Sequence, residues 1–279
     1  MGRIELKTPQ QLRWMREAGL IVADIHRQLR EATQPGVCLR ELDQVSARTI
    51  AEHGAKSNFL GYGGFPATVC ISVNDTVVHG IPDATVLREG DLVSFDCGAY
   101  IERDGKQWHG DAAFTMIVGG DRAGSHEATR LNAVTEASLW AAIAGLARGT
   151  KVNAVGRAVE KTVEDNADGE WTAGIIEEYI GHGIGTKMHM EPEVYNYEVR
   201  GRSPRLKPGM VLAVEPMLVD GEIDTHVLAD NWTVKTDDGR LAAHWEHTVA
   251  ITEGGVWVLT ARDGGAEGLA PFGITPSPA

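Results

Sequence analysis

The sequence has few cysteines, no long hydrophobic run and no excess of basic charge. Its three cysteines, Cys38, Cys70 and Cys97, are odd in number and lack a framework spacing, so a disulfide-stabilised secreted domain is not expected. No apolar stretch reaches the roughly 18 residues of a membrane-spanning helix. The start, from Met1 to Arg16, is polar and charged, unlike a signal peptide. We therefore expect a cytoplasmic protein with no membrane partner.

The charge balance excludes another class of protein. The chain carries 26 basic and 39 acidic residues and a formal net charge of −13, so a globally basic surface for nucleic acid is absent and no specific nucleic-acid partner is expected. Hydrophobic residues make up 43% of the 279 residues, which is enough for a substantial core. Carboxylates that ligate metal ions would explain part of the acidity, because the ions neutralise their charge.

Helical and extended segments alternate along the chain. Thr8 can cap a first helix and Pro9 suits its first turn. The Gly- and Pro-rich segment 262–279 is predicted to be a flexible tail. Periodicity and turn signals predict further helices over about 40–52, 125–146 and 152–166, and strands over 68–73, 76–79, 92–95, 114–118, 211–214, 226–228, 232–235, 248–251 and 256–260.

The chain repeats part of itself. Residues 87–96 and 206–215 each begin with Leu and a basic residue, have Gly at the fourth place, continue with an apolar strand and end in a carboxylate. Asp111 and Glu246 each precede a β-like run that closes on Gly-Gly. The triplet His-Gly-Ile begins at both His79 and His182. Three matches in one order predict that four carboxylates and two histidines converge where two similar halves meet.

The repeat predicts a single catalytic domain over residues 8–261. Its halves, about 8–120 and 121–261, would be related by a pseudo-twofold axis and preceded by an N-terminal arm, residues 1–7. Each half would combine helices with a curved antiparallel sheet, so the predicted fold class is α+β.

A hairpin signal relates the first two acids. Asp104-Gly105 is a strong two-residue turn, and if it closes the hairpin, Asp96 lies opposite Ala113. Asp111 is then a diagonal neighbour of Asp96 on the same face. A one-residue bulge would change this parity.

Taken singly, these residues have structural alternatives: Asp96 could be a strand-end turn residue, Asp111 a loop cap and His182 a packed turn histidine. Together they require cations, because four converging buried carboxylates would repel one another and be costly to desolvate. Carboxylates and imidazole suit divalent transition metals. Two such ions about 3.5–4 Å apart can activate water and polarise a carbonyl, which is equipment for amide hydrolysis.

Eight motifs resemble, in kind and order, the signature set of type I methionine aminopeptidases. The resemblance covers about residues 6–260 and implies the pita-bread fold, in which two similar halves enclose a dinuclear metal centre. The motifs are Gly61 to Pro66, Cys70 to Asn74, His79 to Pro82, His109 to Asp111, Gly181 to Gly185, Met188 to Pro192, Val214 to Pro216 and Glu246 to Thr248.

The resemblance implies two divalent ions (Co, Mn, Fe, Ni or Zn) and a ligand set. Asp111 and Glu246 would bridge the ions. Asp96 would complete one ion, and His182 and Glu215 the other. Glu215 would also assist proton transfer from the attacking water.

The resemblance also implies the substrate-binding residues. His189 would hydrogen-bond the carbonyl oxygen of the substrate, and His79 would face the scissile amide nitrogen. An apolar, sulfur-containing pocket suits a thioether, although family members often carry an aromatic residue where Met188 stands. The implied pocket residues are Phe59, Tyr62, Phe65, Cys70, Met188 and Trp232.

One departure from the family concerns the length of the hairpin. Asp96 and Asp111 are 15 residues apart, four more than the family usually shows, and the extra residues lie around Glu102 to Gln107. Because four is even, the facing of the two acids is preserved. There is no long helical insert in the second half, which argues against the type II subgroup.

The implied reaction is removal of the initiator methionine from nascent polypeptides, with a preference for a small second residue. The partners would be nascent N-termini, and the protein would be a monomer. The basic run within residues 200–207 is read as a solvated loop, with transient ribosome contact as the alternative. The rival functions are a prolidase or aminopeptidase P-like peptidase and a non-catalytic binding module of the same fold.

Overall fold

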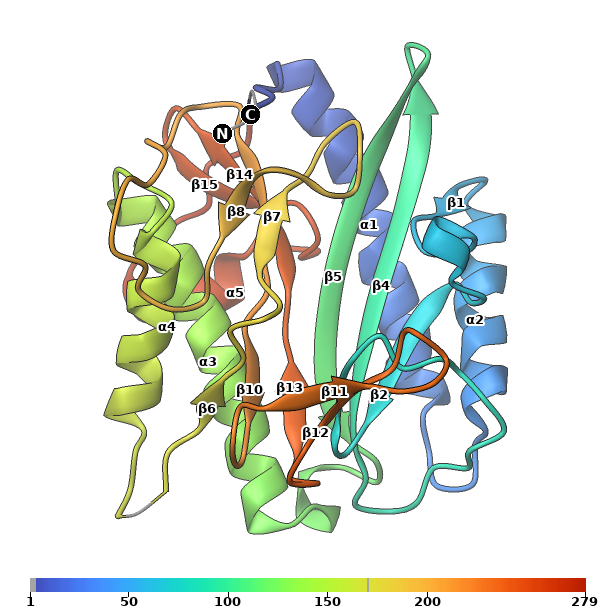
Figure 1. Ribbon diagram of the computed structural model, residues 1–279. Coiled ribbons are helices and arrows are strands. Elements are labelled where there is room, and N and C mark those ends of the chain that lie inside the picture. The colour runs from blue at the N-terminus through green and yellow to red at the C-terminus, as the bar shows by residue number, and fades with distance from the viewer. Residues whose placement is uncertain (1–3, 170) are drawn as a thin grey trace.

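Helices cover the outside of several antiparallel sheets in the computed structural model, which describes residues 4–169 and 171–279 (Figure 1). The helices are α1 (Pro9–Ala32), α2 (Leu39–Glu52), α3 (His126–Arg148), α4 (Ala154–Asp165) and α5 (Ala266–Leu269). The strands are β1 (Lys56–Ser57), β2 (Val69–Val73), β3 (Thr76–Val78), β4 (Leu92–Arg103), β5 (Lys106–Ile117), β6 (Gly174–Ile175), β7 (Gly181–Gly183), β8 (Met190–Val194), β9 (Val211–Val214), β10 (Met217–Val219), β11 (Thr225–Val227), β12 (Val234–Thr236), β13 (Ala242–His244), β14 (His247–Thr252) and β15 (Gly255–Val258).

The two larger sheets come from opposite ends of the chain. One pairs β1, β4 and β2 in that order, with β5 on β4, and the other runs β15-β14-β9-β7-β8. Smaller sheets run β13-β10-β6 and β11-β12-β3. In Figure 1, α1 and α2 lie behind the β4–β5 side, and α3 and α4 lie on the other side. The predicted combination of helices with antiparallel sheets is confirmed.

The β4–β5 hairpin has the register that the sequence predicted. Asp104 and Gly105 have φ angles of 52° and 67°, as a two-residue turn with two left-handed residues requires. From this turn to the far end of both strands the pairing shows no shift, and Asp96 lies opposite Ala113. Asp111 lies opposite Gly98, so Asp96 and Asp111 are diagonal neighbours on one face. The strands continue to the turn, well beyond the short arms that were predicted.

Other predicted elements are present with small boundary shifts. Thr8 caps α1, and its side chain and that of Gln11 form a reciprocal capping box. The sequence did not predict β1, β6, β7, β8, β10 or β13. These strands are short, and several contain Gly or Pro, so they lack the alternation that marks a strand in a sequence.

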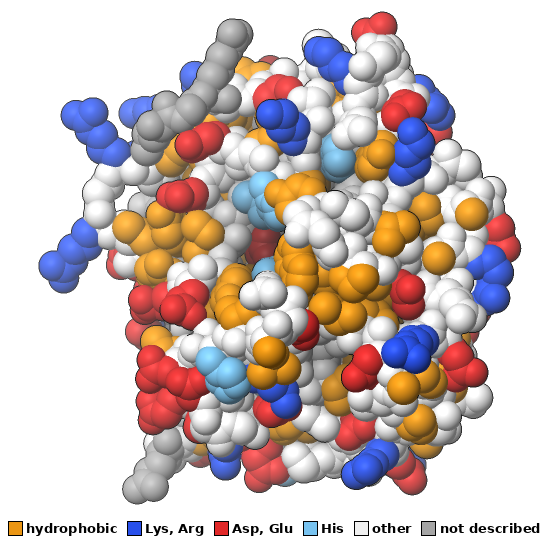
Figure 2. Space-filling model, turned by 45° about the vertical axis from the view of Figure 1, so that its right-hand side comes forward, with side chains coloured by type: hydrophobic (Ala, Val, Ile, Leu, Met, Phe, Trp, Pro, Cys, Tyr) orange, Lys and Arg blue, Asp and Glu red, His pale blue; other side chains and the backbone are white. Residues whose placement is uncertain are grey.

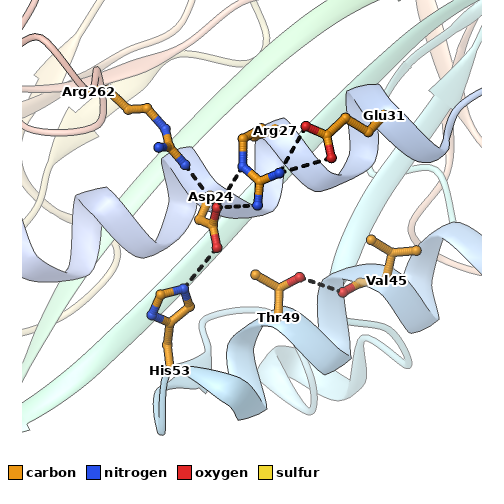
Figure 3. Close-up of polar contacts among 7 residues, drawn as sticks. All are labelled: Asp24, Arg27, Glu31, Val45, Thr49, His53 and Arg262. Atoms are coloured by element: carbon orange, nitrogen blue, oxygen red, sulfur yellow. Dashed lines mark hydrogen bonds and ion pairs between the residues drawn. The ribbon is translucent and has the colours of Figure 1, made fainter.

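The C-terminal segment packs against the domain, although its composition predicted a flexible tail over residues 262–279. Arg262 donates to Asp24 of α1 at 2.9 Å, and Asp24 also accepts from Arg27 and lies 3.0 Å from His53 at the end of α2 (Figure 3). Leu269 is fully buried in the main core. The short helix α5 and its buried Leu269 therefore attach this segment to the core, although its content of Gly and Pro is typical of a loop.

Residues 4–7 of the predicted N-terminal arm are also packed, with the Lys7 N–H donating to the Gly209 carbonyl at 2.8 Å. Residues 1–3 of the arm lie outside the described residues. No helix within residues 4–169 and 171–279 has the length and apolar content to span a membrane. The domain limits at residues 8 and 261 and the division into halves near residue 120 remain predictions.

We expect Gly19→Ala to destabilise the protein, because α1 packs closely on its neighbours at this point. A Cβ at Gly19 would lie 2.3 Å from the Leu259 carbonyl oxygen, and a Cβ at Gly110 would lie 2.8 Å from the Gly19 nitrogen. Overpacking should cost about 1–3 kcal/mol and outweigh the gain in helix propensity of about 1 kcal/mol. The measurement is the free energy of unfolding in urea. Leu20→Ala, at an exposed site on the same helix, is the control and should change that free energy by no more than about 0.5 kcal/mol. A neutral or stabilising Gly19→Ala would refute the close packing.

Candidate metal centre

The two larger sheets meet at the predicted acids, where β5 reaches the start of β14. The Glu246 N–H donates to the Ala113 carbonyl at 2.9 Å, and the Ala113 N–H donates to the Glu246 carbonyl at 3.3 Å. Next to this pair, the Thr248 hydroxyl donates to the Asp111 carbonyl at 2.7 Å and accepts from the Asp111 N–H at 3.0 Å. These bonds fix β5 against the start of β14, so the carboxylates of the two parts of the chain face one another.

Three of the five predicted metal ligands form a tight group. One ligand atom each of Asp111, His182 and Glu246 lies within 4.8 Å of the other two. The other two predicted ligands border the same cavity: Glu215 follows β9, with its Oε1 3.4 Å from His182 Nε2, and Asp96 comes from β4. The structure therefore brings all five together from β4, β5, β7 and the ends of β9 and β13.

In this group, His182 presents a ring nitrogen with a free lone pair to the acids rather than an N–H donor. His182 Nδ1 lies 2.9 Å from the Gly183 carbonyl, which can only accept, so Nδ1 carries the proton. Burial lowers the pKa of His182 to about 3, which keeps the ring neutral. Its Nε2 lone pair then faces a carboxylate oxygen of Glu215, and two acceptors in contact favour a cation between them.

Each of the four acids has a buried oxygen without a hydrogen-bond partner among the described residues: Asp96 Oδ1, Asp111 Oδ1, Glu215 Oε1 and Glu246 Oε1. A buried acceptor without a donor costs about 1–3 kcal/mol, and more when it is charged. Four such oxygens converging on one cavity fit a cation better than they fit any internal hydrogen-bond network. This donor set of carboxylates and imidazole suits divalent transition metals.

Burial and mutual repulsion raise the pKa of all four acids, which favours their protonated forms unless a cation is present. Burial raises the pKa of Asp96 to about 7. Burial first, and the neighbouring carboxylates second, raise the pKa of Asp111, Glu215 and Glu246 well above the usual range. A divalent cation would displace these protons, so its binding must be coupled to pH.

All thirteen residues proposed from the sequence line this one cavity. Figure 2 shows it as a recess with acidic side chains at its floor and histidine and hydrophobic side chains around it. The residues are Phe59, Tyr62, Phe65, Cys70, His79, Asp96, Asp111, His182, Met188, His189, Glu215, Trp232 and Glu246. Their individual roles remain proposals.

One wall of the cavity is apolar. Phe59, Phe65, Cys70 and Met188 form a buried cluster, against which Trp232 packs. The Phe65 and Trp232 rings meet edge to face with centroids 5.2 Å apart. Cys70 lies directly opposite Asp96 in the β2–β4 pairing, so the apolar wall adjoins the acids.

Two further histidines border the cavity without joining the acid cluster. His189 Nδ1 lies 2.8 Å from the Tyr62 hydroxyl, and its ring packs on His182 with centroids 4.4 Å apart. His79 has a φ of 58°, unusual for a residue with a side chain, and its ring lies edge-on to Trp232 at 6.0 Å. Burial lowers the pKa of His79 to about 4, so it is neutral at physiological pH.

The sequence analysis gave no role to two buried histidines near the acids: His109, which it quoted only within a motif, and His244. His109 Nδ1 lies 2.8 Å from Asn58 Oδ1, and His244 Nε2 lies 3.8 Å from Glu215 Oε2. Each stands two places before an acid of the repeat, Asp111 or Glu246. His109 and Asp111 are two residues apart in β5 and therefore share a face. The signal that could have found both histidines is this spacing, because a histidine stands two places before an acid in each half of the repeat.

Comparisons with known proteins give one consistent family. The model of metallopeptidase family M24 matches residues 13–253. A methionine aminopeptidase 1 from Bacillus subtilis is 43% identical over 91% of this chain and 98% of its own length, and one from Mycobacterium tuberculosis is 48% identical over 88% and 91%.

The comparison of structures agrees. A methionine aminopeptidase from Thermotoga maritima superimposes with a TM-score of 0.85 at 36% identity, covering 93% of this chain and all of that chain. This match confirms the predicted pita-bread fold, and the family confirms that the resemblance was correct. The chain belongs to metallopeptidase family M24 and, within it, to the methionine aminopeptidases.

Proposed function

We propose that this protein is a divalent-metal-dependent aminopeptidase that removes the initiator methionine from nascent polypeptides and prefers a small second residue. The observation that supports the proposal is that one cavity contains both a cluster of acids and an apolar pocket. Four buried acids with unpartnered oxygens lie beside a pocket of aromatic and sulfur-containing side chains. The first feature suits a metal-assisted hydrolase and the second suits a methionine side chain.

Asp96, Asp111, His182, Glu215 and Glu246 would hold two divalent ions, with Asp111 and Glu246 shared between them. When bound, such ions supply Lewis acidity that polarises the scissile carbonyl and lowers the pKa of water. The candidate metals are Co, Mn, Fe, Ni and Zn. Coordination geometry and the availability of each metal in the cell determine which of them is bound.

The chain's own residues would orient the substrate. The methionine side chain would pack against the apolar wall. This would place the α-amine and the scissile carbonyl of the same methionine over the acids. His189, held by the Tyr62 hydroxyl, would donate to the carbonyl oxygen as negative charge develops there. His79 would face the amide nitrogen, and Glu215 would accept a proton from the attacking water and return it to the leaving amine.

The same cavity could serve a prolidase or aminopeptidase P-like peptidase, or it could bind without catalysis. The pocket favours methionine over proline because Cys70 and Met188 are polarizable and buried beside aromatic rings. We further propose that the protein acts as a monomer in the cytoplasm. The basic loop within residues 200–207 would at most contact the ribosome transiently.

Metal and substrate can be tested together. We expect release of methionine from Met-Ala-Ser, loss of this activity after exhaustive chelation, and recovery on adding back one divalent metal under anaerobic conditions. Metal content per chain, measured in parallel, gives the number of ions. Cleavage of Xaa-Pro peptides instead would favour the prolidase alternative, and metal binding without any cleavage would favour the binding module.

Removing one acid charge should separate metal binding from stability. Asp111→Asn and Glu246→Gln should each lower metal content and reduce kcat/KM by at least about 100-fold, since both would bridge the ions. Because burial makes ionisation of these acids costly, a neutral amide in place of either acid should not lower the thermal stability of the metal-free protein. Asp237→Asn, at an exposed acid paired with His226, is the matched control. Full metal content in Asp111→Asn would contradict the assignment.

The stability of metal-stripped protein should depend on pH in a particular direction. A carboxyl whose pKa is raised, such as Asp96 at about 7, binds a proton in the folded but not in the unfolded chain. Its stabilisation is therefore present at low pH and is lost as pH rises through about 7. Between pH 6.5 and 8 the buried neutral histidines no longer contribute, so thermal unfolding of metal-free protein should shift to lower temperature. Saturating metal should abolish this trend, and a metal-free midpoint that rises over this window would count against it.

A further inference from the structure

The N-terminal arm reaches the segment that carries two residues of the cavity. The Lys7 ammonium donates to the Ile184 carbonyl at 2.5 Å, and its side chain is 2% exposed. Glu5 accepts from the Thr186 hydroxyl at 2.7 Å and from the Thr186 N–H at 3.3 Å. A Cβ at Gly185 would lie 2.4 Å from Glu5 Oε1 and 2.5 Å from Lys7 Nζ, so this glycine admits both side chains. We call Glu5 and Lys7, with their contacts to 184–186, the arm clamp.

The clamped segment is also held from its other side. The Gly185 carbonyl accepts from the His109 N–H of β5 at 3.1 Å. In Figure 1 the chain that follows β7 crosses toward the β4–β5 hairpin before it returns as β8. The segment therefore lies between the arm and the strand that carries Asp111.

The connection from β7 to β8 is held differently at its start and at its end. His182 lies inside β7, where it pairs with Ala213 of β9 and Glu193 of β8. Residues 184–189 lie outside any strand, and Met188 and His189 are the last of them before β8. The sheet thus holds the proposed metal ligand. Met188 and His189 have no strand pairing, and their place depends on side-chain contacts, such as the bond of His189 to Tyr62, and on what holds the backbone of residues 184–187.

The burial of a charged residue argues that the clamp is specific. Burial lowers the pKa of Lys7 to about 8, although Glu5 partly offsets this effect, so the ammonium is held at a cost. The partner carboxylate of Glu5 is 28% exposed and lies 3.5 Å away, so the pair only partly offsets the burial of Lys7. A buried charge is weak evidence for stability, and its best-attested use is to specify one arrangement over others. Here the arrangement is the position of the backbone at Ile184 and Thr186.

We propose that Lys7 and Glu5 are positioning residues that set the place of Met188 and His189 in the substrate cavity. This inference rests on the proposed function, because it is through the substrate that the position of these side chains matters. The clamp acts on the oxyanion donor and the pocket wall, not on the metal ligands. Loosening it should therefore lower turnover while metal binding is retained.

Two variants break the clamp in different ways. Lys7→Met keeps the length of the side chain but removes the donor, and Gly185→Ala pushes Lys7 and Glu5 away from the segment. Both should lower kcat for Met-Ala-Ser about 10-fold, the order expected for a small misplacement of a catalytic group. Metal content and metal affinity should remain within about twofold of the wild type, because β7 still holds His182. Lys7→Arg should recover part of the activity.

The matched control is Lys56→Met, which removes another lysine and its ion pair with Glu102, both exposed on the hairpin side of the molecule. It should leave kcat unchanged. A readout that needs no activity is amide hydrogen exchange, which should accelerate within residues 184–189 in Lys7→Met and Gly185→Ala but not in Lys56→Met.

Thr186→Val gives an independent route if either clamp variant folds poorly, since it removes only the hydroxyl that binds Glu5. Wild-type kcat and unchanged exchange at 184–189 in the variants would overturn the proposal. So would a loss of activity that follows loss of metal or of folded protein. If the wild type itself fails to cleave Met-Ala-Ser, the proposed function fails, and the exchange measurement still decides whether the clamp holds the segment.

Discussion

The structure depends on carrying four acids into one buried cavity from two distant parts of the chain. Their mutual repulsion and desolvation oppose folding, and burial raises the pKa of every one of them. The backbone bonds between Ala113 and Glu246 and the Thr248 bonds to Asp111 hold the strands together at that point. The acids converge because these backbone bonds fix the strands that carry them. A divalent cation would neutralise the clustered carboxylates, so its binding would offset the free-energy cost of burying them.

Close packing elsewhere serves the same junction. Gly19 and Gly110 allow α1 to approach β5 closely, so the long β4–β5 hairpin packs against this helix. The unbroken register of that hairpin then fixes the diagonal relation of Asp96 and Asp111. A slip of one residue would turn one acid to the opposite face. The position of the proposed ligands Asp96 and Asp111 thus follows from strand pairing. The proposed substrate residues Met188 and His189 instead lie on a connection whose place depends on contacts from other segments.

The sequence predicted the parts of the site that follow local rules. Asp104-Gly105 defined the hairpin, and the repeated order of His and carboxylates identified the acids that line the cavity. The resemblance to methionine aminopeptidases then supplied the pocket residues, which periodicity alone would have assigned to the core. The packing of residues 262–279 was missed because composition indicated a loop, while Leu269 and the bond from Arg262 to Asp24 are tertiary contacts. The contacts of Glu5 and Lys7 with residues 184–186 span about 180 positions in the chain and leave no local pattern.

The repeated His-Gly-Ile triplet shows how two similar halves come to play different parts. In both copies the glycine is required for the same reason, since a Cβ at Gly80 or at Gly183 would lie 2.1 Å from a backbone carbonyl oxygen. The histidines differ in their backbone. His182 lies in β7 with its Nε2 toward the acids, whereas His79 takes a left-handed conformation and meets the Trp232 ring. Matching positions in the repeat therefore supply one candidate ligand and one candidate substrate contact, because the backbone lies in a strand at His182 and is left-handed at His79, and the two side chains meet different walls of the cavity.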